Sequence, residues 1–194
     1  MYQQLISRLK EYLSCTDMNA RYMSRFYPPG LAPIESSQLF RDDSFYTFTL
    51  RLRRIISNHL AGRFDQYELN FWIIQRWGGI FNFRDNPSNR AKMVSFAEAL
   101  NERKPLNLSN IASLSKIASF VNPDHFFIYD SRAVYSLNRI LLDTDYQGGY
   151  YPIPHGRGDQ YRVQELRNCI RERVTGRKAF YPNKTAYYQY SILR

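Results

Sequence analysis

The sequence predicts an all-α fold. Apolar residues recur three and four positions apart in several segments, as in helices that bury one face, most clearly in residues 111–121 and 133–141. Proline and glycine, which end helices, stand between these segments. A hydrophobic fraction of 44% in 194 residues is enough for a core, and this length suits one domain or two small lobes.

Four helices are expected in the first half of the chain. An amphipathic helix over residues 2–13 precedes a loop rich in Pro, Gly and Ser. A long helix follows over residues 42–60, and a second strongly apolar helix covers residues 65–77. Residues 85–88 form a turn with a capping signal, which predicts a helix over residues 89–101.

The centre of the chain predicts two helices joined by a tight connection. The first covers residues 111–121 and ends at Asn122-Pro123-Asp124, because proline lacks an N–H and forces the preceding residue into extended geometry. Asp130 precedes the apolar period of residues 133–141 and is expected to cap this second helix with its carboxylate.

The C-terminal part predicts a long loop and a basic helix. Residues 145–159 contain four glycines, two prolines and three tyrosines, and form either a recognition loop or a flexible connector. A helix with four arginines is expected over residues 161–174, and the aromatic segment 187–190 is expected to fold back onto the core.

Charge favours a polyanionic partner. The chain has 27 Lys and Arg against 17 Asp and Glu, a net charge of +10 and a pI of about 9.7. Such a domain binds phosphates with release of counterions, and 16 tyrosines supply surfaces on which unpaired bases can stack. We therefore expect nucleic acid as the partner; the alternative is a basic protein with a tyrosine-rich core.

Several classes of protein are not favoured. No segment approaches the roughly 18 apolar residues of a membrane span, and the first residues lack a signal-peptide profile. Two distant cysteines do not suggest a disulfide framework, and three scattered histidines do not have metal-ligand spacing: Cys15, Cys169, His59, His125 and His155. We expect no metal, no cofactor and no membrane association. The expected location is intracellular, either cytoplasmic or nucleoid-associated.

One stretch carries residues that suggest chemistry. Ser115-Lys116-Ile117-Ala118 and Ile128-Tyr129-Asp130-Ser131-Arg132 place a lysine and an aspartate 14 residues apart. This stretch resembles the helix-hairpin-helix DNA glycosylases, especially the 8-oxoguanine glycosylase/AP-lyase branch. The match extends over roughly residues 108–139. The chain departs from that family at Ala112 and Leu114, where the family has two glycines that let the backbone approach a DNA phosphate.

The resemblance implies a fold and a catalytic pair. The fold would have two helical lobes and a cleft between them. Residues 1–41 and 145–194 would form the smaller lobe, and residues 42–144 would form the lobe that carries the helix-hairpin-helix element. Lys116 would be the amine nucleophile, and Asp130 the carboxylate that supports it.

The chemistry explains why these two groups are needed. Breaking a glycosidic bond builds positive charge on the sugar, which a fixed carboxylate stabilises. An amine can attack C1′ and hold the sugar as a Schiff base, but only where its site is desolvated or carries another cation. We expect the apolar residues Leu114, Ile117 and Phe120 to desolvate Lys116.

The remaining expectations concern the substrate. The partner would be double-stranded DNA, from which a monomeric enzyme extrudes a damaged or modified base. The nucleic-acid contacts are expected at Ser113, Ser115, Ser131, Arg132 and Arg157. The candidates for the base pocket are Phe120, Phe126, Trp72, Tyr150 and Tyr151, although a tryptophan such as Trp72 more often packs in the core.

Three alternatives remain open. Asp130 alone is typical of a helix cap, and Lys116 alone is typical of a solvated charge. The protein would then be a non-catalytic DNA-binding module of the same fold, in which Lys116 contacts a phosphate. Pro123-Asp124 resembles the start of a metal-dependent nuclease motif, but no acidic-x-Lys tripeptide follows. A structural or host-interaction protein would bind DNA negligibly.

Overall fold

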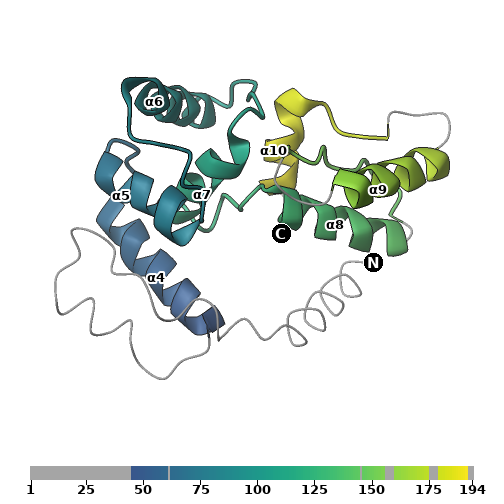
Figure 1. Cartoon of the computed structure of the whole chain (residues 1–194), viewed down its shortest axis with the longest axis horizontal. Coiled ribbons are helices and arrows are strands. Elements are labelled where there is room, and N and C mark those ends of the chain that lie inside the picture. Colours follow the sequence, from purple (N-terminus) through teal and green to yellow (C-terminus); the bar gives the residue numbers. More distant parts are fainter. Residues whose placement is uncertain (1–44, 61, 145, 156–159, 175–178, 192–194) are drawn as a thin grey trace. The chain divides into compact units, whose positions relative to one another are not determined.

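A computed structural model describes residues 45–60, 62–144, 146–155, 160–174 and 179–191. These residues are mostly helical and contain no β-strand, which confirms the predicted class for this part of the chain (Figure 1). The predicted helix over residues 2–13 lies outside the described residues. The helices are α4 (Phe45–Leu60), α5 (Tyr67–Trp72), the π-helical turn η1 (Ile73–Trp77), α6 (Pro87–Asn101), α7 (Ile111–Val121), α8 (Ser131–Asp143), α9 (Gln160–Arg173) and α10 (Asn183–Ser191).

The chain forms two compact units. Among the described residues, the first unit contains residues 45–104 and 113–128, and the second contains residues 105–112 and 129–191. The chain passes between the units three times in these residues: after Lys104, after Ala112 and after Ile128. Helix α8 therefore belongs with α9 and α10, whereas the sequence analysis grouped it with residues 42–144.

In the first unit, the expected helix over residues 65–77 is a short α-helix that continues into a π-helical turn. Helix α5 starts at Tyr67, and η1 ends at Trp77, where the backbone N–H of Gly78 donates to the carbonyl of Ile73 at 2.8 Å. This hydrogen bond spans five residues instead of four, so the last turn is wider than an α-helical turn. Gly79 has a φ of +67°, which ends the helical geometry.

Helix α6 begins at Pro87, two residues before the predicted start at residue 89, and its N-cap lies inside the predicted turn. The Asn86 side chain accepts a hydrogen bond of 2.8 Å from the Asn89 N–H, and Pro87 occupies the first helical position, where no N–H is needed. The exposed Arg90 guanidinium donates to Asp85 and lowers the pKa of that carboxyl group. The helix packs through Met93, Phe96 and Leu100.

Helix α7 is the most deeply buried element of the first unit. Every residue from Ser113 to Val121 is buried. The Ser57 hydroxyl of α4 donates to the Val121 carbonyl at 3.3 Å, and the helix ends at the predicted break, Asn122-Pro123. This helix is therefore a central core element and not an amphipathic surface helix.

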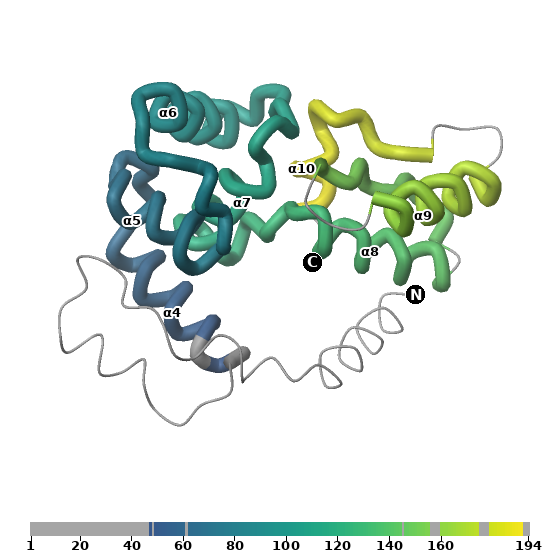
Figure 2. Tube along the Cα trace, in the orientation of Figure 1, coloured from purple at the N-terminus to yellow at the C-terminus, as the bar shows by residue number. Residues whose placement is uncertain are grey.

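In the second unit, Asp130 caps α8 as predicted. The buried residues of α8 include Val134 and Leu141, those of α9 include Leu166 and Ile170, and the two helices run side by side (Figure 2). Helix α9 spans Gln160–Arg173, close to the predicted residues 161–174.

Hydrogen bonds hold the described part of the predicted long loop in place. The side-chain amide of Asn138 donates to the Tyr151 carbonyl at 2.7 Å, and its oxygen accepts from the Tyr151 N–H at 2.9 Å. Tyr150 pairs with the segment at Phe180 through an isolated parallel bridge. Tyr150 and Tyr151 are therefore tied to the segment at Phe180 and to α8.

Four tyrosines join the loop, the start of α8 and the C-terminal helix. The Tyr129 ring lies 5.8 Å from that of Tyr187 and 5.0 Å from that of Tyr190, and the Tyr151 ring lies 5.6 Å from Tyr190. The Tyr129 hydroxyl donates to the Pro152 carbonyl at 2.7 Å. The aromatic segment 187–190 thus folds back onto the core, as predicted.

This tyrosine cluster predicts a loss of stability in alkali. Burial, reinforced by the neighbouring tyrosines, raises the pKa of Tyr129 above its ordinary value of 10.0. A raised pKa contributes stability that is fully present below pH 10 and is lost as the pH rises toward the folded-state pKa. Above pH 10 the unfolding free energy of the wild type should fall as the pH rises. In Tyr129→Phe we expect this fall to be smaller, by about 1.4 kcal/mol per pH unit. Tyr161→Phe, at a side chain that is 81% exposed, is the control. Equal slopes in the two variants would contradict this prediction.

Candidate functional site

Lys116 is buried in α7. Its relative exposure is 6%, and lysine is almost never this buried unless a partner compensates its charge. Its side chain passes next to Gly78, because a Cβ placed on Gly78 would lie 2.6 Å from Cδ and 2.9 Å from Cε of Lys116. The expected desolvation of its amine stays a prediction.

Aromatic residues and an arginine line the same side of α7. Phe120 lies one helical turn after Lys116, and its ring meets that of Trp77 edge to face at 4.8 Å. The Arg53 guanidinium of α4 stacks over the Phe120 ring at 5.8 Å, which is a cation–π distance. The helix turn of Lys116 is thus next to an apolar wall that also carries a cation.

Asp130 is the N-cap of α8. Its Oδ1 accepts hydrogen bonds from the backbone N–H groups of Arg132 at 3.1 Å and of Ala133 at 2.9 Å. The carboxylate also acts on Tyr190, whose pKa is raised first by burial and then by Asp130. Asp130 therefore has a structural role, whether or not it also has a chemical one.

The predicted nucleic-acid contacts differ in exposure. Ser113 and Ser115 are buried in α7, so their hydroxyls offer no surface to a phosphate in this conformation. Ser131 is half-buried and Arg132 is exposed at the start of α8. Arg157 lies outside the described residues.

The five candidates for the base pocket are divided between the two units. Phe120, Trp72 and Phe126 belong to the first unit, in which the first two are buried and Phe126 is half-buried. Tyr150 and Tyr151 belong to the second unit and are each 1% exposed. The burial of Trp72 confirms the prediction that this residue packs in the core.

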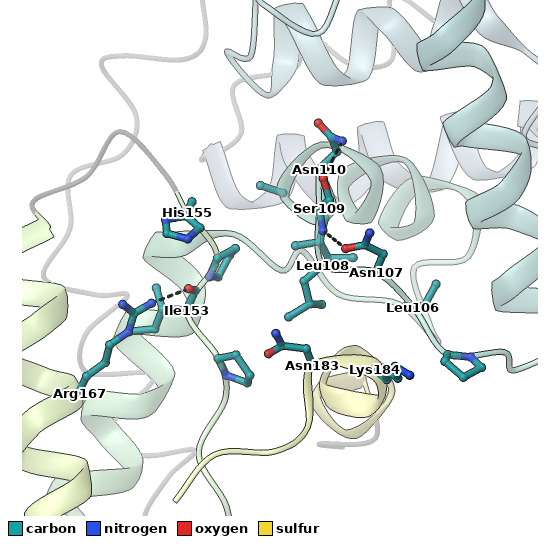
Figure 3. Close-up of a pocket in the computed structure, with 15 residues that line it drawn as sticks. Leu106, Asn107, Leu108, Ser109, Asn110, Ile153, His155, Arg167, Asn183 and Lys184 are labelled. Atoms are coloured by element: carbon teal, nitrogen blue, oxygen red, sulfur yellow. Dashed lines mark hydrogen bonds between the residues drawn. The ribbon is translucent and has the colours of Figure 1, made fainter.

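A cavity of about 820 Å³ lies in the second unit and includes none of these residues (Figure 3). The turn before α7 forms one wall, and residues 152–155 form the wall across from it. No sequence pattern indicated this cavity, although Arg167 lies in the predicted basic helix. The lining residues are Pro105, Leu106, Asn107, Leu108, Ser109, Asn110, Ile111, Ala112, Pro152, Ile153, Pro154, His155, Arg167, Asn183 and Lys184.

The turn before α7 has a defined local structure. Asn107 accepts a hydrogen bond from the Ser109 N–H at 2.8 Å, and Asn110 has a φ of 60°, which asparagine tolerates better than most residues. The Ile111 N–H donates to the Leu108 carbonyl at 3.1 Å. Lys116 is thus well inside the helix that this turn introduces.

Comparison of the chain with protein-family models, with curated proteins and with solved structures gives no significant match. In the described part of the chain, no helix is long and apolar enough to cross a membrane. The same residues contain no cluster of three or more His, Cys, Asp or Glu that could hold a metal ion.

The contact between Gly78 and Lys116 predicts an energetic coupling. A Cβ at Gly78 would overlap the Lys116 side chain and also lie 2.7 Å from the Ile74 carbonyl. We expect Gly78→Ala to reduce the unfolding free energy by roughly 1–3 kcal/mol, as overpacking does.

A double-mutant cycle measures the part of this cost that is due to Lys116. Combined with Lys116→Ala, Gly78→Ala should cost less, with a coupling of roughly 0.5 kcal/mol or more. Gly79→Ala is the control, because its Cβ meets nothing within 4 Å and its cost should add to that of Lys116→Ala. Additive costs for Gly78 would show that Lys116 does not occupy this position.

Proposed function

We propose that this protein is a DNA glycosylase that excises a damaged or modified base and cleaves the strand through a Schiff base on Lys116. The observation that carries the proposal is the burial of a lysine residue, 6% exposed, in an apolar helix beside an aromatic wall. The net charge of +10 supports a DNA partner. The proposed fold is that of the helix-hairpin-helix glycosylases, and the proposed enzyme is a monomer that acts inside the cell.

The reaction needs Lys116 as a neutral amine. Its Nζ attacks C1′ of the extruded nucleotide, the N-glycosidic bond breaks, and the base leaves with its bonding electron pair and gains a proton. Loss of the amine proton and opening of the sugar ring give an iminium ion between Nζ and C1′. Removal of a proton from C2′ then breaks the bond from C3′ to the phosphate oxygen, which cleaves the strand.

Lys116 and Asp130 belong to different units, and Asp130 is proposed, as the resemblance implies, to stabilise the positive charge that develops on the sugar. Its role as the cap of α8 is compatible with this, because the cap fixes the carboxylate in one position. The exposed side chain of Arg132 is a proposed phosphate contact. The backbone N–H groups of Arg132 and Ala133 are less suited to that contact, since they already donate to Asp130.

A non-catalytic DNA-binding module is the second candidate. It is favoured by one observation: the two cap hydrogen bonds give Asp130 a structural role that needs no chemistry. The module would bind DNA without nicking abasic sites or excising a base.

Borohydride trapping tests the nucleophile. With oligonucleotides that carry an abasic site, 8-oxoguanine or other modified bases, we expect the wild-type protein to form a covalent complex on reduction. Lys116→Gln should abolish the complex because the amide is not a nucleophile. Lys92→Gln, at an exposed lysine of α6, is the matched control and should trap normally. Trapping that persists in Lys116→Gln would reject the assignment.

Asp130→Asn separates the chemical role from the structural one. Asparagine is as good an N-cap as aspartate, so we expect the unfolding free energy to change by about 0.5 kcal/mol or less. The single-turnover excision rate should fall by roughly 100-fold or more, because the charge is lost. Asp143→Asn, which removes an exposed carboxylate paired with Arg139, is the control. An unchanged rate in Asp130→Asn would leave Asp130 as a cap only.

A further inference from the structure

The cavity of the second unit has walls that hydrogen bonds hold in place. The Leu106 N–H donates to the Lys184 carbonyl at 3.1 Å, which ties the turn before α7 to the start of α10. The opposite wall is held by the Tyr129 hydroxyl on the Pro152 carbonyl and by the Arg167 guanidinium, which donates to the Ile153 carbonyl at 3.0 Å. The site therefore needs little reorganisation to receive a ligand.

The charge of the lining selects an anion. Arg167 and Lys184 line the cavity, and no aspartate or glutamate is among the lining residues. The hydrogen bond to Ile153 also fixes the orientation of the Arg167 guanidinium, whose planar group suits a phosphate. The first residues of α7, Ile111 and Ala112, add the positive end of a helix dipole to the same cavity.

The rest of the lining suits a base and a sugar. Four neutral polar side chains can both donate and accept hydrogen bonds, and Figure 3 shows Asn107, Ser109 and Asn110 across the cavity from His155, with Asn183 between the two walls. Leucine, isoleucine and proline supply apolar contacts for a flat ring. The volume of about 820 Å³ lies within the range of small-ligand sites.

We propose that this cavity binds one nucleotide unit, with its phosphate at Arg167 and its base among the asparagine side chains. The unit is either a free nucleoside monophosphate or a nucleotide within a single strand. The chemistry of recognition is the same in the two cases. The inference does not rest on catalysis by Lys116, because Lys116 and Asp130 are not among the lining residues.

Calorimetric titration of the full chain with dGMP tests the proposal. We expect saturable binding in which deoxyguanosine and inorganic phosphate each bind more weakly than dGMP. Arg167→Gln should weaken dGMP binding by roughly tenfold or more, as the loss of a charged hydrogen bond does. Arg171→Gln, at an exposed arginine of the same helix that does not line the cavity, is the matched control and should bind as the wild type does.

Two further lining variants, one competitor and Lys116→Gln complete the test. Asn183→Ala and Lys184→Gln alter exposed lining residues at the start of α10, so they test the site even if Arg167→Gln fails to fold.

Displacement of dGMP by a short single-stranded oligonucleotide would identify a nucleotide in a strand as the ligand. Lack of displacement would identify a free nucleotide. Binding should persist in Lys116→Gln, which separates this site from the proposed catalysis. Absent dGMP binding, equal affinity for phosphate alone, or unchanged affinity in all three lining variants would overturn the proposal.

Discussion

The complete burial of α7 from Ser113 to Val121 is the constraint on which the first unit depends. A helix without an exposed side needs partners all round, and one of its residues is a lysine. The end of the π-helical turn η1 leaves room for the side chain of this lysine. The turn ends with the hydrogen bond from the Gly78 N–H to the Ile73 carbonyl. Gly78 has no side chain, and the Lys116 side chain passes next to it. π-helical turns are frequent at functional sites, which agrees with the role proposed for this lysine.

The second unit depends on polar groups that hold a loop without regular structure. Asn138 satisfies both backbone groups of Tyr151, at 2.7 and 2.9 Å, and Tyr129 satisfies the Pro152 carbonyl. Buried backbone groups need such partners, since each one left unsatisfied costs about 1–3 kcal/mol. The same hydrogen bonds hold the loop as a wall of the cavity. The proposed nucleotide site therefore depends on the bonds that also stabilise the second unit.

The helices were predictable because their signals are local. The apolar period of residues 111–121, the proline break and the cap at Asp130 all act within a few residues, and each is where the sequence placed it. The π-helical turn was not predictable, because the apolar pattern over residues 65–77 suits an α-helix equally well. Nor was C-terminal helix α10, since residues 183–191 have only a weak helical pattern.

The candidate site was predictable only in part, for a similar reason. From the sequence, Lys116 alone is typical of a solvated charge, but neighbours distant in sequence, such as Trp77 and Arg53, pack beside its helix turn. The burial of Ser113 and Ser115 follows from the same tertiary packing. The cavity could not be inferred at all, because its lining comes from four separate stretches of the chain that come together only on folding.

The central claim is that the Lys116 amine forms a covalent bond with the sugar of DNA. Peptide mapping of the borohydride-reduced complex tests this most directly. A modified lysine resists trypsin, so the adduct should appear in a peptide from Lys104 to Arg132, and fragmentation should place the sugar remnant on Lys116. A remnant on Lys104, on another lysine or on the N-terminal amine would contradict the account.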